Sequence, residues 1–221
     1  MILGYEIQTM VFIAITFVIA ISLHEFAHAR AADKLWDPTP RLQWRLTPNP
    51  LKHIDPLWFI LIFIIQFGRG RPVQINPAYF KNALRDELLV AVAWPAMNIL
   101  LALFGIMVSA WVAAASGVEN TIMNWTPLYD FWSTFAQLNV VLAVFNMLPI
   151  PPLDGYRIIQ YLFPATQRFF LQYWRYIWMI AIAILLVPNP VGSWLQNLIM
   201  IITKFLYAML ARPFDNLLLF L

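Results

Sequence analysis

The sequence HEFAH places His24, Glu25 and His28 within five residues of one another. On a helix, His24 and His28 lie four residues apart on one face, so both imidazoles can reach the same metal ion. Glu25 projects about a quarter-turn away from His24 and can contact a water at the metal without becoming a ligand. This pattern predicts a zinc site in which Glu25 acts as the general base.

A second polar element, Asp154 followed by Gly155, comes directly after a proline-rich run. Prolines break a helix, and glycine permits a tight turn beside the aspartate. A catalytic zinc takes three protein ligands and leaves one position for water, so a carboxylate is the ligand type that two histidines lack. The sequence has no cysteine, which restricts any metal to histidine and carboxylate ligands. The alternative for this segment alone is an ordinary helix-ending loop with a solvated aspartate.

The composition is that of an integral membrane protein. The chain has 221 residues, of which 62% are hydrophobic and 11% are charged, and the charged share is about half that of a soluble domain. Polar groups inside a membrane segment cost a few kcal/mol each on insertion scales, so a motif such as HEFAH needs a compensating function. The alternative is a polar helix end that is hydrated at the membrane surface.

Five apolar runs approach or exceed the roughly 20 residues that a helix needs to cross a bilayer, and they predict an all-α membrane protein. They cover residues 7–29, 88–115, 129–148, 173–187 and 191–210. The first lacks preceding basic residues, so we expect a retained helix and not a removable signal peptide. We expect one membrane domain over residues 1–221, with a catalytic core of about residues 7–160 and C-terminal helices over about residues 173–210.

Two shorter segments suggest additional elements between the first and second spans. The apolar run 57–67 is too short to cross and fits a re-entrant or interfacial element. Residues 72–77 alternate like an extended strand, which predicts a possible small strand region. Such a strand must lie at the interface or in a protein-lined cavity, because lipid cannot pair its backbone groups.

The basic residues indicate how the chain is oriented. They follow the first and fifth spans, precede the second and lie between the third and fourth, whereas segments 116–127 and 188–190 contain none. The positive-inside rule then places the N-terminus outside, the C-terminus in the cytoplasm and the active site toward the cytoplasmic side of the cell membrane. A net charge of +3 is modest, so we expect no nucleic-acid partner.

Together the two motifs resemble those of the site-2 protease family, the intramembrane zinc metalloproteases. That family pairs H-E-x-x-H on one membrane helix with N-x-x-P-x-P-x-x-D-G on a later one. In this sequence the second motif reads Asn146, Pro149, Pro151, Asp154 and Gly155. Segments 52–56 and 72–77 resemble the small bacterial and archaeal members that lack a PDZ domain. The resemblance covers roughly residues 10–160.

The family also carries a G-P-x-x-N element on the helix between the two motifs. This sequence matches it at Pro95 and Asn98 but has Trp94 in place of the glycine. A glycine lets another backbone approach closely and tryptophan forbids that, so we expect helix packing or substrate entry to differ there. We do not expect a direct effect on the metal site.

The resemblance implies hydrolysis of peptide bonds in or near the transmembrane helices of membrane protein substrates. It assigns Zn²⁺ to His24, His28 and Asp154. Asn98 is a candidate contact for the substrate backbone or the oxyanion, and a helix–helix hydrogen bond is an equal alternative. Asn146 could orient the Asp154 loop.

Two alternatives to proteolysis stay open, and in both the protein lies in the lipid bilayer. A metal or ion transporter would need ionisable residues along several spans, yet little beyond the two motifs and Lys204 lies inside them. A catalytically inactive member that binds membrane partners is the second, and the intact Glu25 argues against it. His53 could line the site, although an interfacial position is favoured. The sequence leaves the oligomeric state open.

Overall fold

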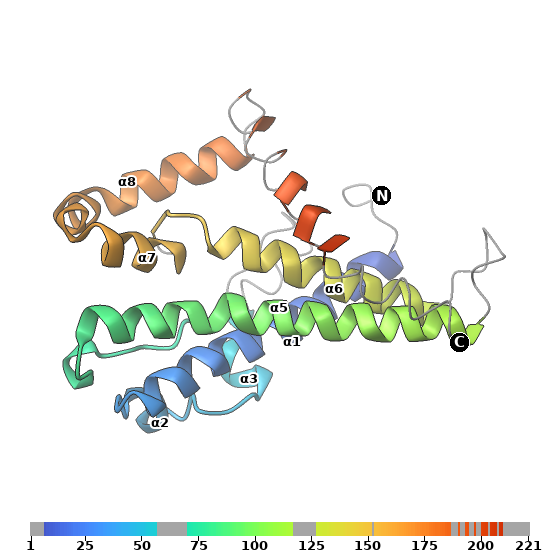
Figure 1. Ribbon diagram of the computed structural model, residues 1–221, viewed down its shortest axis with the longest axis horizontal. Helices are drawn as coiled ribbons and strands as arrows, with labels where there is room; N and C mark the ends of the chain where they lie inside the picture. Colours follow the sequence, from blue (N-terminus) through green and yellow to red (C-terminus); the bar gives the residue numbers. More distant parts are fainter. Residues whose placement is uncertain are drawn as a thin grey trace.

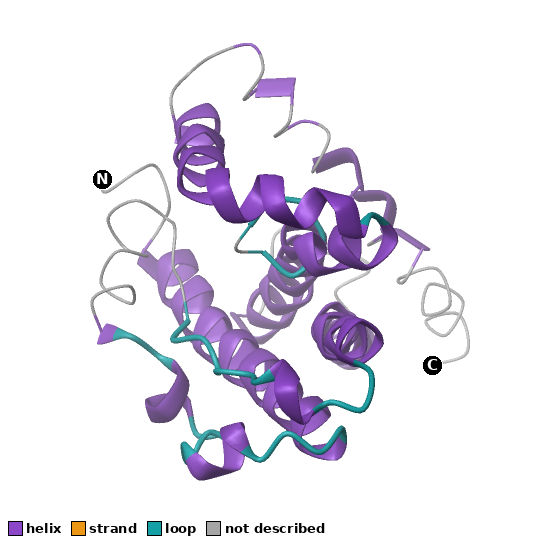
Figure 2. Cartoon of the chain, turned by 90° about the vertical axis from the view of Figure 1, so that its left-hand side faces the viewer, coloured by secondary structure: helices purple, strands orange, loops and turns teal. Residues whose placement is uncertain are grey.

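The computed structural model describes residues 7–56, 70–116, 127–151 and 153–186, together with isolated residues between 190 and 209. Figure 2 shows this part of the chain as helices joined by loops, without a sheet. The elements are α1 (Ile7–Lys34), α2 (Thr39–Leu42), α3 (Pro50–His53), η1 (Pro77–Tyr79), α5 (Ala83–Ser116), α6 (Pro127–Asn146), α7 (Gly155–Leu162), η3 (Pro164–Thr166) and α8 (Gln167–Leu186). The predicted all-α class is therefore confirmed for the described residues.

Three of the described helices are long and apolar enough to cross a membrane. These are α1, α5 and α6. They contain most of the first three expected spans, and α8 contains most of the fourth. The fifth span and the re-entrant run 57–67 fall largely or wholly outside the described residues. The count of five spans therefore stays a prediction.

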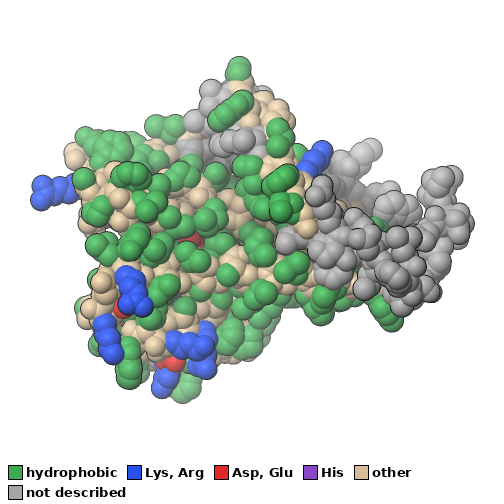
Figure 3. Space-filling model, in the orientation of Figure 1, with side chains coloured by type: hydrophobic (Ala, Val, Ile, Leu, Met, Phe, Trp, Pro, Cys, Tyr) green, Lys and Arg blue, Asp and Glu red, His purple; other side chains and the backbone are tan. Residues whose placement is uncertain are grey.

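The three long helices form one bundle in which each packs against the other two. Figure 1 shows α5 running alongside α6 in the opposite direction, with α1 packed against them. On the face that Figure 3 shows, the described part of the bundle is largely apolar, and Lys and Arg gather mainly at the end that holds α2 and α3. An apolar flank with charges at one end is the surface that a membrane-spanning bundle requires.

Proline positions explain where α6 begins and ends. Pro127 opens the helix, where its missing N–H costs nothing, and Asp130 places a carboxylate in the first turn. The helix ends at Asn146, just before Pro149 and Pro151, because proline cannot continue the hydrogen-bond ladder. Pro95, by contrast, is accommodated inside α5. The chain therefore leaves α6 in an irregular turn that leads to α7.

Small residues bring α5 and α6 close together. A Cβ atom added at Gly105 would lie 3.0 Å from the Ala136 Cβ and 3.0 Å from the Phe135 Cδ1. Ala136 and Ala102 are completely buried. In a membrane bundle, such small residues let two backbones approach and increase van der Waals contact.

The expected strand at residues 72–77 is not present in the described structure. Only an isolated antiparallel bridge joins Ile54 and Gly70. The backbone N–H groups of Val73 and Asn76 instead donate to the carboxylates of Glu25 and Asp37, both at 2.8 Å. The segment is extended as its sequence pattern suggests, but side chains satisfy these donors in place of a neighbouring strand.

We predict that Gly105→Val loosens the contact between α5 and α6. The added side chain must displace Ala136 or Phe135, and overpacking of this kind typically costs about 1–3 kcal/mol. Thermal unfolding in detergent should show a lower midpoint. Met107→Val on the same helix is the matched control, since Met107 is 44% exposed. Equal midpoints for both variants would contradict the close packing at Gly105.

Candidate metal centre

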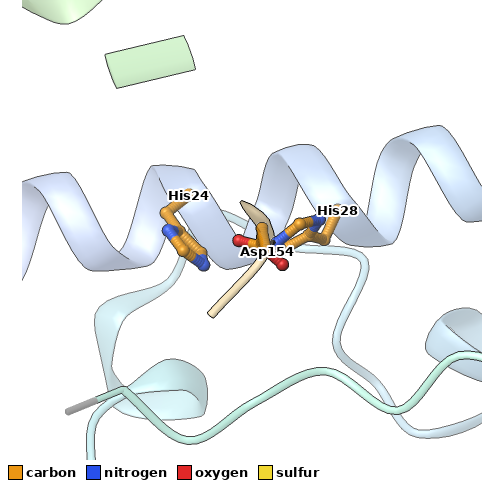
Figure 4. Close-up of side chains that lie close together, drawn as sticks. All are labelled: His24, His28 and Asp154. Atoms are coloured by element: carbon orange, nitrogen blue, oxygen red, sulfur yellow. Dashed lines mark hydrogen bonds and ion pairs between the residues drawn. The ribbon is translucent and has the colours of Figure 1, made fainter. Parts of the chain in front are cut away.

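The structure brings His24, His28 and Asp154 together. The two histidines lie on α1 and are buried, and Asp154 lies at the start of α7. One potential ligand atom from each residue lies within 4.8 Å of the other two. Figure 4 shows the three side chains side by side, with Asp154 approaching the helix that carries both histidines. Such a group could hold a metal ion.

The hydrogen bonds of His28 favour a cation at this position. Its Nδ1 lies 3.0 Å from the Val90 carbonyl oxygen, and its Nε2 lies 3.2 Å from the Asp154 Oδ2. A carbonyl oxygen can only accept, so Nδ1 donates to Val90, and when the ring is neutral the lone pair of Nε2 faces the carboxylate. Two acceptors that face each other in a buried site are stabilised by a shared cation. Two imidazoles and one carboxylate are the ligand set of many catalytic zinc sites, so the residues fit zinc.

Gly155 determines where Asp154 can lie. A Cβ atom added at Gly155 would overlap the Met147 carbonyl oxygen and lie 2.5 Å from that of Leu148. The start of α7 therefore packs directly against the end of α6, and only glycine fits there. Asp154 occupies the N-cap position of α7 without making a side-chain cap. Its carboxylate is consequently free to face His28.

An ion pair holds α7 against α5. Arg157 Nη1 lies 3.0 Å from Glu87 Oε2, and both side chains are partly exposed. The pair joins the first turn of α7 to the first turns of α5. A partly exposed pair contributes little stability by itself, but it restricts the orientation of the helix that begins at Asp154.

Glu25 is buried beside the metal cluster but is not part of it. Its Oε2 accepts a hydrogen bond from the Val73 N–H at 2.8 Å. Its Oε1 lies 3.4 Å from the His24 Nε2, which is longer than a normal hydrogen bond. One carboxylate oxygen is therefore fixed while the other keeps its capacity to accept a proton.

Trp94 contacts His24 of the metal cluster, a contact that the sequence did not predict. The residue is completely buried, and its ring centroid lies 3.7 Å from that of His24. Asn98, one turn further along α5, is also completely buried. Neither atom of its amide has a hydrogen-bond partner within the described structure. The alternative of a helix–helix hydrogen bond at Asn98 therefore finds no support there.

Asn146 and His53 lie in other environments than expected. The Asn146 amide donates to the Leu142 carbonyl at 3.0 Å, inside its own helix and not to the Asp154 loop. The His53 side chain is completely buried, not half-buried as expected, and its Nε2 lies 2.6 Å from the Thr47 carbonyl oxygen. Burial lowers the pKa of His53, although the hydrogen bond to Thr47 opposes this. The ring therefore supports the loop after α1.

Comparisons with known proteins identify the family. The description "Peptidase family M50" matches residues 110–188. "Putative zinc metalloprotease YwhC" of Bacillus subtilis (strain 168) is 42% identical over 166 residues, which cover 75% of each chain. This chain belongs to peptidase family M50. "Putative zinc metalloprotease Rip2" of Mycolicibacterium smegmatis is 30% identical over 193 residues, 82% of this chain and 69% of that protein. No solved structure matches the chain.

In this M50 peptidase, two contributions to the site come from backbone groups that sequence reasoning missed. The Val90 carbonyl holds His28, and the Val73 N–H holds Glu25. No side-chain pattern reveals either group, because every residue type carries a carbonyl and all but proline an N–H. The extended pattern at residues 72–77 was the only signal that backbone donors near Val73 needed partners.

We predict that Gly155→Ala weakens zinc binding by this M50 peptidase. The added methyl group forces α7 away from the end of α6 and moves the Asp154 carboxylate. Changes in the support of a metal ligand typically cost about 10–100-fold in affinity. Competition with a chelator in detergent measures the loss, and Tyr161→Ala on the exposed face of α7 serves as the control. Wild-type affinity in Gly155→Ala would show that this close approach does not position Asp154.

Proposed function

We propose that this zinc metalloprotease cuts peptide bonds within or beside the transmembrane helices of other membrane proteins. In this proposal His24, His28 and Asp154 hold the zinc ion. The observation that carries it is the position of both histidines and Glu25 within α1, a 28-residue helix long and apolar enough to cross a membrane. A peptide bond must reach the depth of that helix to meet them.

The general base in this proposal is Glu25. Zinc bound at the cluster would act as a Lewis acid toward the attacking water and the scissile carbonyl. Val73 holds Oε2 of the carboxylate, so Oε1 is the atom that accepts the proton of the water. The same oxygen then returns the proton to the leaving amine. Because two imidazoles and one carboxylate already supply three ligands, Glu25 is not needed as a fourth.

The proposal gives Asn98 a role in binding the substrate backbone or the oxyanion. Its amide is buried and unpaired within the described structure, and it lies one turn from Trp94 on α5. A buried amide without partners is unfavourable, and a peptide group of the substrate would satisfy it. Asn146 donates its hydrogen bond to Leu142 within its own helix, so we assign it no role in binding substrate.

Transport is the weaker alternative for this site. A path for ions or metals would carry several ionisable groups through the bundle. Among the described residues, His24, His28 and Asp154 form the one group of histidines and acids that could hold a metal. The free oxygen of Glu25 beside this group favours hydrolysis over simple binding.

We predict that Glu25→Gln folds and retains zinc but no longer cleaves a reconstituted transmembrane substrate. Glutamine keeps the size of the side chain and can still accept a hydrogen bond from Val73, but it cannot take up the proton. The loss of general base catalysis is typically about 10²–10⁴-fold. Elemental analysis and a gel-based cleavage assay measure the two properties separately. His28→Ala is the matched variant and should lose both. Near wild-type cleavage by Glu25→Gln would contradict the mechanism.

We further propose an orientation with the active site toward the cytoplasm, and single cysteines can test it because the chain has none of its own. A membrane-impermeant maleimide added outside intact cells should label Asn120→Cys and leave Gln167→Cys unlabelled. The reason is that segment 116–127 lacks basic residues, whereas 156–172 contains Arg157 and Arg168. The reverse labelling pattern would overturn the orientation, and equal labelling of both positions would contradict a single span between them.

A further inference from the structure

The two histidines of the metal cluster are supported differently. Metal-binding histidines almost always use their second ring nitrogen in a hydrogen bond that fixes the ring. His28 follows this rule through Val90. The Nδ1 of His24 is buried and has no partner within the described structure, and its Nε2 is 3.4 Å from Glu25 Oε1. No hydrogen bond of normal length therefore fixes the His24 ring there.

Trp94 provides the contact that His24 otherwise lacks. The two ring centroids are 3.7 Å apart and the planes meet at 75°, so the edge of one ring lies directly against the other. The same indole lies nearly parallel to the His28 ring, with the planes at 13° and the centroids 6.3 Å apart. Val90 and Trp94 are one turn apart on α5, so one face of this helix supports both imidazoles.

A role in filling space alone does not explain this tryptophan. Its Nε1 is buried without a hydrogen-bond partner among the described residues, which is unfavourable. An aliphatic side chain would fill the bundle without burying an unpaired polar group. What the indole adds is a rigid aromatic surface against the two imidazoles.

We propose that Trp94 is a positioning residue that fixes the His24 ring by aromatic packing, in place of a hydrogen bond, and so strengthens zinc binding. The proposal rests on the zinc site proposed above. Its consequence is that zinc affinity depends on an uncharged side chain that cannot itself ligate the metal.

The test compares Trp94→Leu, Trp94→Met and Trp94→Phe with the wild-type protein in detergent. We expect the two aliphatic variants to bind zinc about 10–100-fold more weakly in chelator competition, and Trp94→Phe to lose less. The absorption spectrum of bound Co²⁺ should change with them, because the His24 ring is no longer fixed. The control is Trp111→Leu on the same helix, where the side chain is 63% exposed and zinc binding should be unchanged.

Unfolding temperatures with and without zinc separate positioning from simple packing. If Trp94 only stabilised the bundle, its loss would lower both temperatures equally and leave the rise caused by zinc intact. We expect the rise caused by zinc to shrink in both aliphatic variants. Wild-type zinc affinity and an unchanged cobalt spectrum in either aliphatic variant would overturn the proposal, as would failure of both to fold without zinc.

If the proposed metal site itself is wrong, the experiments give a different result. In that case the wild-type protein binds no zinc, or His24→Ala retains it at full affinity. If His24→Ala loses zinc while Trp94→Leu binds it normally, the metal site stands and only the role of Trp94 is rejected.

Discussion

The contact between His28 and Asp154 joins groups that are 126 residues apart in the chain. It can form only if α7 begins directly beside the end of α6. Three features of the fold meet that condition. Prolines stop α6, Gly155 removes the side chain that would block the approach, and the ion pair between Arg157 and Glu87 holds α7 to α5. A buried carboxylate and imidazole are costly unless they are paired. The fold thus places each beside the other and leaves both able to share a metal ion.

Small residues and polar residues have complementary roles in the bundle. Gly105 and its alanine neighbours let α5 and α6 approach closely, which stabilises helices that gain little from the hydrophobic effect in lipid. His24, Glu25, His28 and Asn98 are buried within the same bundle. Burial lowers the local dielectric constant and so strengthens the electrostatic interactions of these polar groups.

The sequence predicted the helices and the candidate ligands well, because both leave side-chain patterns. Apolar runs 88–115 and 129–148 correspond closely to α5 and α6, and the spacing of His24 and His28 needs only a helix to bring them together. Three features escaped prediction for a physical reason. The extended segment 72–77 gives its backbone donors to Glu25 and Asp37 instead of to a strand. The Val90 carbonyl carries no side-chain signal, and the burial of His53 depends on how one loop folds.

The first half of α5 contacts three separate parts of the site. Glu87, Val90 and Trp94 follow at intervals of three and four residues, so they lie along one side of the helix. Through them α5 contacts α7, His28 and His24 in turn. A rotation of α5 about its own axis would disturb all three contacts at once, so none can be adjusted alone. Mutations that alter the pitch or tilt of this single helix are therefore expected to disturb the support of both histidines and of the aspartate together.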